Sequence, residues 1–219
     1  MVKRAASIRD KAHVGNPPTP SPARLPSPAD QLAALLAEIR ACTRCAAVLP
    51  LGPRPVVRAA ASARILLVGQ APGTKVHATG ISFNDPSGDQ LRRWLGLDRA
   101  TFYDESRIAI MAVGLCYPGT GPNGDLPPRP ECAPLWHPRL RALLPRLALT
   151  LLIGSHAVAY YLGRQPGSLA DTVRRWREFA PDFLPMPHPS PRNRNWLKTN
   201  PWFEAELVPE IRRRVHELL

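Results

Sequence analysis

The chain has 219 residues, of which 44% are apolar and 21% are charged, which suits a globular protein with a substantial core. Its apolar runs are too short to cross a membrane as a helix, and its charged N-terminus lacks the apolar core of a secretory signal. The formal net charge of +12 favours a polyanionic partner, with nucleic acid first and an acidic membrane surface second.

The first segment, residues 1–29, is rich in proline and basic side chains and poor in apolar ones. Such a segment buries too little apolar surface to offset the entropy that it would lose on ordering. We therefore expect a disordered tail, followed by one domain over residues 30–219. The tail is either a passive extension or a basic arm that raises nonspecific affinity for DNA.

The rest of the chain alternates helical patterns with short apolar runs. Asp30 can cap a helix that runs to about Arg40, and Ser87, with capping-box spacing to Gln90, can start another that ends at Gly96. Further helices are expected over residues 131–144 with a break or kink at Pro138, over 155–161, over 168–179, and from Asn200 onward with an interruption at Pro209. Buried strands are expected at residues 64–68, 107–113, 149–153 and 183–186.

This alternation predicts an α/β fold with three layers, αβα, around a central, mostly parallel sheet of about four strands. Ligands of such folds bind beyond the carboxyl ends of the strands. The loops over residues 69–86 and 187–199 both emerge at that edge, so we expect the functional site there.

His188 lies in a proline-rich loop directly after the last expected strand. Pro187 and Pro189 flank it, and proline fixes its own φ and restricts the residue before it. A polar, basic stretch follows over residues 192–195, and functional residues gather on such loops. Taken alone, a His-Pro dipeptide is more simply explained as a surface turn.

Four cysteines could form one metal centre. Cys42 and Cys45 form a C-x-x-C pair after the first helix, while Cys116 and Cys132 are widely spaced. Structural disulfides are not expected without a secretory signal, and four thiolates suit either zinc or an iron–sulfur cluster. The wide second pair favours the cluster, because a compact zinc ribbon usually has two C-x-x-C knuckles. Four unrelated thiols are the simplest alternative.

Three motifs and the four cysteines carry a resemblance to a known family. Gly69-Gln-Ala-Pro-Gly73 follows the first strand, His188-Pro-Ser190 follows the last, and Gly80-Ile-Ser-Phe83 lies between them, together with the four cysteines. From about Leu32 to its C-terminus the chain resembles the uracil-DNA glycosylase superfamily, most of all its iron–sulfur branch from thermophiles and many bacteria.

The resemblance implies a role for each matching residue. His188 would donate a hydrogen bond to the departing base, and Phe83 would stack on the flipped base. The backbone of Gln70, Ala71 and Gly73 would contact a base carbonyl. Contacts to DNA would come from four further residues: Ser190, Arg192, Arg194 and Lys198. The cluster, 4Fe–4S by resemblance or zinc as the alternative, would be bound by Cys42, Cys45, Cys116 and Cys132.

The chain departs from the family pattern where the attacking water is positioned. Ala71 occupies the place of an aspartate in the most efficient uracil enzymes, and no carboxylate lies within residues 74–77. Asp85 is the nearest downstream acid and His77 the nearest other polar candidate for this task. An apolar residue, Ala112 or a neighbour, occupies the slot of an asparagine that reads the base edge in the iron–sulfur branch.

The resemblance therefore implies a DNA repair glycosylase that hydrolyses the N-glycosidic bond of uracil or a related deaminated base in base excision repair. Its partner would be single- or double-stranded DNA, and we expect a cytoplasmic, nucleoid-associated bacterial monomer with no membrane contact. Two alternatives stay open. The first is a non-catalytic nucleic-acid-binding relative. The second is a serine or carboxylate hydrolase, against which the sequence shows no G-x-S-x-G elbow and no well-placed acid pair.

Overall fold

A five-stranded sheet forms the centre of the computed structural model, which describes residues 26–122 and 124–219. The order is β1-β3-β2-β6-β7, and every neighbouring pair is parallel except β1 with β3. The strands are β1 (Val57–Arg58), β2 (Ile65–Val68), β3 (Ile108–Met111), β6 (Leu149–Ile153) and β7 (Phe183–Met186). The predicted strands are confirmed as β2, β3, β6 and β7. The expected count of about four omitted β1, because two residues carry no periodic signal.

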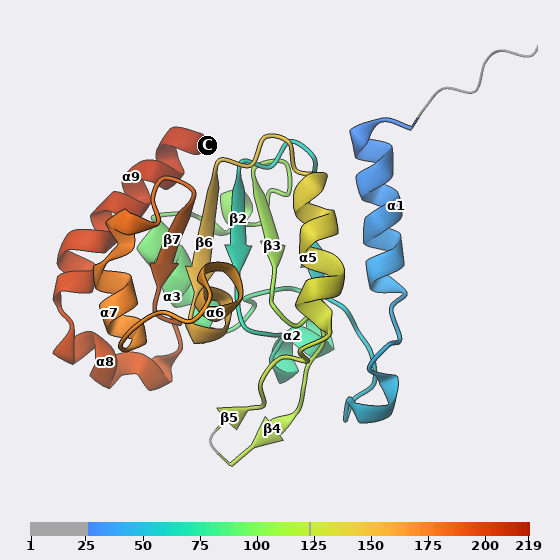
Figure 1. The fold of residues 1–219 in the computed structure, drawn as a ribbon, viewed down its shortest axis with the longest axis horizontal. Coiled ribbons are helices and arrows are strands. Elements are labelled where there is room, and N and C mark those ends of the chain that lie inside the picture. Colours follow the sequence, from blue (N-terminus) through green and yellow to red (C-terminus); the bar gives the residue numbers. More distant parts are fainter. Residues whose placement is uncertain (1–25, 123) are drawn as a thin grey trace, which may run out of the picture.

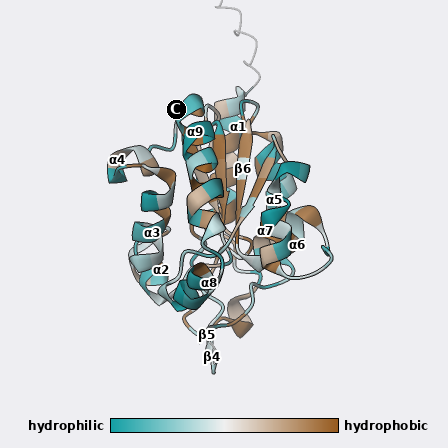
Figure 2. Ribbon diagram, turned by 90° about the vertical axis from the view of Figure 1, so that its left-hand side faces the viewer, coloured by the Kyte–Doolittle hydropathy of each residue, from teal (hydrophilic) through white to brown (hydrophobic). Residues whose placement is uncertain are grey.

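Helices cover both faces of this sheet, which confirms the three-layer α/β architecture (Figures 1 and 2). One layer holds α1 (Pro28–Arg40), α5 (Cys132–Ala142) and α6 (Ser155–Leu162). The other holds α3 (Pro86–Leu95), α4 (Arg99–Phe102), α7 (Leu169–Arg174) and α9 (Val208–Leu218). Beyond the carboxyl ends of the strands lie α2 (Thr74–Thr79), α8 (Arg194–Thr199) and a hairpin of β4 (Thr120–Gly121) and β5 (Gly124–Asp125).

The core is divided in two by the sheet, because successive side chains of a strand point to opposite faces. On β2, Leu66 and Val68 pack with the α1, α5 and α6 layer, while Ile65 and Leu67 pack with the α3 and α9 layer. All four side chains are completely buried. Burying one such side chain contributes about 1.5–3 kcal/mol, so the strand is fixed from both faces.

Two helices have their caps earlier than the sequence suggested, by three residues in α1 and by two in α3. Ser27 caps α1 by accepting a hydrogen bond from the amide of Asp30, whose carboxylate bonds back to Ser27. Asp85, not Ser87, caps α3. The expectation that Asp30 and Ser87 are the caps was wrong. In both helices a proline occupies the first helical position, so the true cap is the residue directly before that proline.

Prolines also disturb the helices less than expected. Helix α5 continues through Pro138, and Pro209 lies in the first turn of α9, after a π-helical turn at Phe203–Leu207. The helix expected over 168–179 ends at Arg174, and a 3-10 turn, Trp176–Glu178, follows.

The predicted tail, residues 1–29, lies mostly outside the described residues, and its last two residues belong to α1. Within the described ranges, no helix has the length and apolar character needed to span a bilayer.

Candidate active site

A pocket of about 420 Å³ opens at the carboxyl ends of β2, β3 and β7, where the expected loops meet. Pockets of this size accept small molecules or single nucleotide units. Most of the predicted site residues line it, from loops far apart in the sequence: Gln70, Ala71, Gly73, Phe83, Asp85, His188, Ser190 and Arg192. The fold thus brings together the motifs that the sequence singled out.

Three predicted residues lie outside the pocket. His77 is on α2, where its ring centroid lies 6.1 Å from that of Tyr117. Arg194 lines a neighbouring hollow between the start of α3 and the His188 loop. Lys198 is exposed on α8.

The loop around His188 is held by hydrogen bonds of its own. The Ser190 amide donates to Nδ1 of the ring at 3.2 Å, and the Asn193 side chain donates to the His188 carbonyl at 2.7 Å. Because Nδ1 accepts, the proton of the neutral ring is on Nε2, which is then the donor. Burial lowers the pKa of His188, and the carboxylates of Asp85 and Asp125 oppose this shift. The ring is therefore a neutral hydrogen-bond donor at pH 7.

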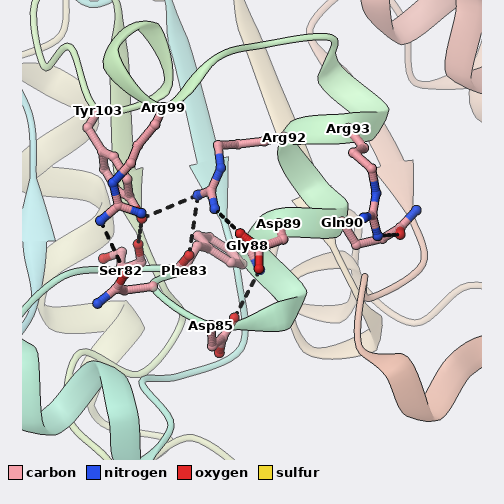
Figure 3. Close-up of polar contacts among 11 residues, drawn as sticks. Ser82, Phe83, Asp85, Gly88, Asp89, Gln90, Arg92, Arg93, Arg99 and Tyr103 are labelled. Atoms are coloured by element: carbon pink, nitrogen blue, oxygen red, sulfur yellow. Dashed lines mark hydrogen bonds and ion pairs between the residues drawn. The ribbon is translucent and has the colours of Figure 1, made fainter.

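Phe83 has a strained backbone that its neighbours hold in place (Figure 3). Its φ is 54°, a left-handed value that costs a non-glycine residue on the order of 1–3 kcal/mol. The Tyr103 hydroxyl donates to the Ser82 carbonyl at 2.8 Å, and Arg92 approaches the Phe83 carbonyl at 3.5 Å. A Cβ on Gly88 would stand only 1.7 Å from that carbonyl, so glycine is required there. Together these contacts fix the direction of the Phe83 side chain.

Asp85 lines the pocket but already has a structural task. Its Oδ1 accepts a hydrogen bond from the Gly88 amide at 2.9 Å and so caps α3 (Figure 3). This carboxylate therefore stabilises the helix that supports Phe83.

The loop after β2 packs directly against the Phe83 ring. A Cβ on Gly69 would stand 3.2 Å from the end of that ring, so only a small residue fits. The carbonyls of Gly69 and Gln70 accept hydrogen bonds from the amides of Val113 and Gly114, both at 2.9 Å. The segment after β3 thus supports the floor of the pocket.

Asp125 and Asn193 line the pocket and were missed by the sequence reasoning. Neither lies in a recognisable motif, and Asp125 comes to the site from the β4–β5 hairpin, which lies beyond the carboxyl ends of the strands. The presence of an acid in a long glycine- and proline-rich loop was the one available signal. Ala112, which by resemblance takes the place of the base-reading asparagine, also lines the pocket.

All four cysteines line a second hollow, at the end of α1 and the start of α5. Burial raises the pKa of the Cys132 thiol to about 12 and also raises that of Cys116, and in both cases the neighbouring thiols add to the shift. Four sulfur donors around one largely apolar space fit a group bound by four thiolates. In the described part of the chain, no three histidine, cysteine or acidic side chains form a ready-made site for a single ion.

Comparison with known proteins gives two findings. The sequence model of the Uracil DNA glycosylase superfamily matches residues 57–212. The chain is also similar to the solution NMR structure of a protein from Methanosarcina acetivorans, itself only provisionally named a uracil DNA glycosylase. The identity is 17%, the TM-score is 0.45, and the match covers 73% of this chain and 98% of that one.

Proposed function

Because the chain belongs to the uracil DNA glycosylase superfamily, we propose that it hydrolyses the N-glycosidic bond of uracil, or of a related deaminated base, in DNA. The observation that carries this proposal is the neutral His188 ring, a donor held at the edge of a pocket that Phe83 also lines. Such a site would supply the two features that the reaction needs, a surface for a flipped base and a donor for its negative charge.

The base would first leave the DNA stack and enter the pocket. The Phe83 ring would stack on it, since the strained backbone and the Gly69 contact hold the ring in one place. The backbone of Gln70, Ala71 and Gly73 would face the edge of the base. Because Ala71 and Ala112 carry no polar side-chain group, backbone atoms would supply most of the recognition on this side.

His188 would act on the leaving group. Cleavage builds positive charge on the sugar and negative charge on the base. A neutral ring that donates from Nε2 stabilises that negative charge, and its orientation is fixed in advance by the Ser190 amide and the flanking prolines. Ser190, Arg192, Arg194 and Lys198 would bind phosphates around the site, since all four lie on or after the same loop.

We further propose that the four cysteines bind an iron–sulfur cluster, as the resemblance to the iron–sulfur branch implies, with zinc as the alternative. The group would act as a structural cross-link between α1, α5 and the segment after β3. That segment reaches the pocket, because the Gly114 amide bonds to the Gln70 carbonyl.

The metal proposal has a direct test. Protein purified without oxygen should be brown, and Cys116→Ser should lose the colour and melt at a lower temperature. Colourless wild-type protein that holds one zinc per chain would contradict the cluster and keep the structural role.

A non-catalytic nucleic-acid-binding relative is the second candidate. Ala71 in place of the water-positioning aspartate, and Ala112 in place of the base-reading asparagine, favour it. Such a protein would bind DNA and release no base.

Base release from DNA separates the two candidates. Purified full chain would be incubated with oligonucleotides that carry uracil, hypoxanthine, xanthine, or thymine opposite guanine, and the free base would be measured by chromatography. We expect release of uracil or another deaminated base above the rate without protein. DNA binding with no release from any of the four would contradict the glycosylase and favour the non-catalytic relative.

A further inference from the structure

We propose that Asp125, on the β4–β5 hairpin, is the carboxylate that holds and deprotonates the attacking water. This inference rests on the proposed glycosylase function and assigns the task left open by Ala71. Asp125 lines the same pocket as His188 but comes from a segment outside both motif loops.

The Asp125 carboxylate has a defined orientation at the pocket. Its Oδ2 lies 3.4 Å from the point where a Cβ on Gly73 would stand, directly against the loop after β2. Its Oδ1 faces the Thr120 hydroxyl at 3.4 Å, and that hydroxyl lies 2.5 Å from the Tyr117 hydroxyl. One oxygen is thus turned to the hairpin and the other to the pocket side.

The hairpin is held between the two motif loops, as its place beyond the carboxyl ends of the strands suggests (Figure 1). On one side, the Gln70 side chain donates to the Leu126 carbonyl at 3.2 Å. On the other, the Arg192 guanidinium packs on Gly124, where a Cβ would stand 2.2 Å from Nη1. Gly124 has a φ of 119°, a backbone conformation that favours glycine. These contacts place Asp125 beside the residues that would bind the base and the phosphate.

The chemistry of hydrolysis suits a carboxylate at this point. The bond between C1′ and the base nitrogen breaks, and its electron pair leaves with the base. A water oxygen forms the new bond to C1′, Asp125 takes the proton that this water loses, and the base anion gains a proton from solvent. The negative carboxylate also stabilises the positive charge on the sugar.

Asp85 is the competing acid, and its contacts favour a different role. One of its oxygens caps α3 through the Gly88 amide. Asp125 makes no comparable contact to a helix end within the described residues; there its Oδ1 accepts a hydrogen bond from the Thr120 hydroxyl, which leaves Oδ2 for the water. Both carboxylates act on the pKa of His188, which agrees with both facing the same pocket.

The test compares single-turnover base release by the full chain from DNA that carries uracil or 5-fluorouracil. Fluorine makes the base a better leaving group, so loss of a leaving-group donor matters less with this substrate. We expect Asp125→Asn to slow both substrates by the same factor, on the order of a hundredfold, with unchanged affinity for DNA. His188→Ala should slow the release of 5-fluorouracil by a smaller factor than it slows the release of uracil. Asp85→Asn should slow base release by less than tenfold, because asparagine also caps helices.

Failure of the Asp125 assignment and failure of the proposed function give different results. If wild-type protein is active and Asp125→Asn keeps more than a third of its rate, or if Asp85→Asn is the slower variant, the assignment of Asp125 is wrong. If wild-type protein releases no base from any of the four oligonucleotides named under the proposed function, that function fails, and this inference fails with it. Melting curves of both asparagine variants serve as the control for folding.

Discussion

In the proposed mechanism Phe83 and His188 would act on the base through different physical effects, and each depends on backbone that other residues hold. The left-handed φ of Phe83 is stable only because Tyr103 and Gly88 fix the segment around it. The tautomer of His188 follows from a single amide, that of Ser190. At both positions the neighbours set the geometry that the side chain uses.

Replacing Phe83 by leucine should weaken base release without unfolding the protein. Stacking of a base on an aromatic ring contributes about 1–3 kcal/mol, so the single-turnover rate constant divided by Kd should fall by roughly 5- to 150-fold. Phe102→Leu is the matched control, because that ring is fully buried beside Phe83 and should affect the melting temperature rather than catalysis. Equal losses of activity in the two variants would show that Phe83 only supports the fold.

Sequence patterns identified the site residues that lie in rigid motifs, and failed for those that the tertiary fold brings in. His188 was singled out by its flanking prolines, and Phe83 and the loop after β2 by their resemblance to the family motifs; all of them line the pocket. Asp125 was missed because its position depends on the hairpin, which has two-residue strands and no motif. His77 was chosen by proximity in sequence, but helix α2 carries it outside the pocket lining.

At the scale of the elements, α5 links the cysteine hollow to the pocket. Cys132 begins this helix, and its side chain accepts a hydrogen bond from the Leu115 amide at 3.4 Å. One turn further on, the buried His137 ring lies 3.0 Å from the Ala112 carbonyl and 2.8 Å from the Tyr161 hydroxyl. The helix thus holds the segment that follows β3 from two points.

The buried His137 should make stability depend on pH. Burial lowers its pKa from 6.5 to about 4 in the folded protein. Below pH 6.5 the unfolded chain therefore binds a proton that the folded protein does not bind until about pH 4, so stability falls as pH drops through this window. The loss is on the order of 3 kcal/mol, from about 1.4 kcal/mol per pKa unit.

Denaturant unfolding between pH 7 and pH 4 measures this effect. His137→Gln should be less stable than wild type at pH 7 and should lose less stability on acidification, because the titrating group is absent. Parallel pH curves for the two proteins would contradict the assignment of this titration to His137.

The elements themselves were predicted where a run of apolar residues was long enough to show a period. The four core strands were found as continuous apolar runs, and α1 and α3 were found from their helical patterns with their first residues misplaced. Helix starts were missed because a proline at the first helical position follows the true cap, so that a later capping-type residue looked equally suitable. Strands as short as β1, β4 and β5 have no such signal and depend on tertiary contacts.

At the scale of the whole molecule, the net charge of +12 predicts strong salt dependence of DNA binding, because phosphate contacts release counterions. Arg192→Ala should reduce the slope of log Kd against log salt concentration by about one, since it removes one phosphate contact beside the pocket. Arg146→Ala is the control. Arg146 is exposed and directly precedes β6, so it lies at the amino-terminal ends of the strands, away from the pocket. Affinity that does not change between low and moderate salt would argue against nucleic acid as the partner.

Single-turnover base release by His188→Ala shows whether His188 stabilises the departing base. Removing one such oriented donor costs about 2.7–4 kcal/mol, so the rate should fall on the order of a hundred- to a thousandfold, far more than in His77→Ala or Asp85→Asn. DNA binding should be nearly unchanged, because the contact strengthens mainly in the transition state. Base release by His188→Ala at the wild-type rate would contradict the mechanism.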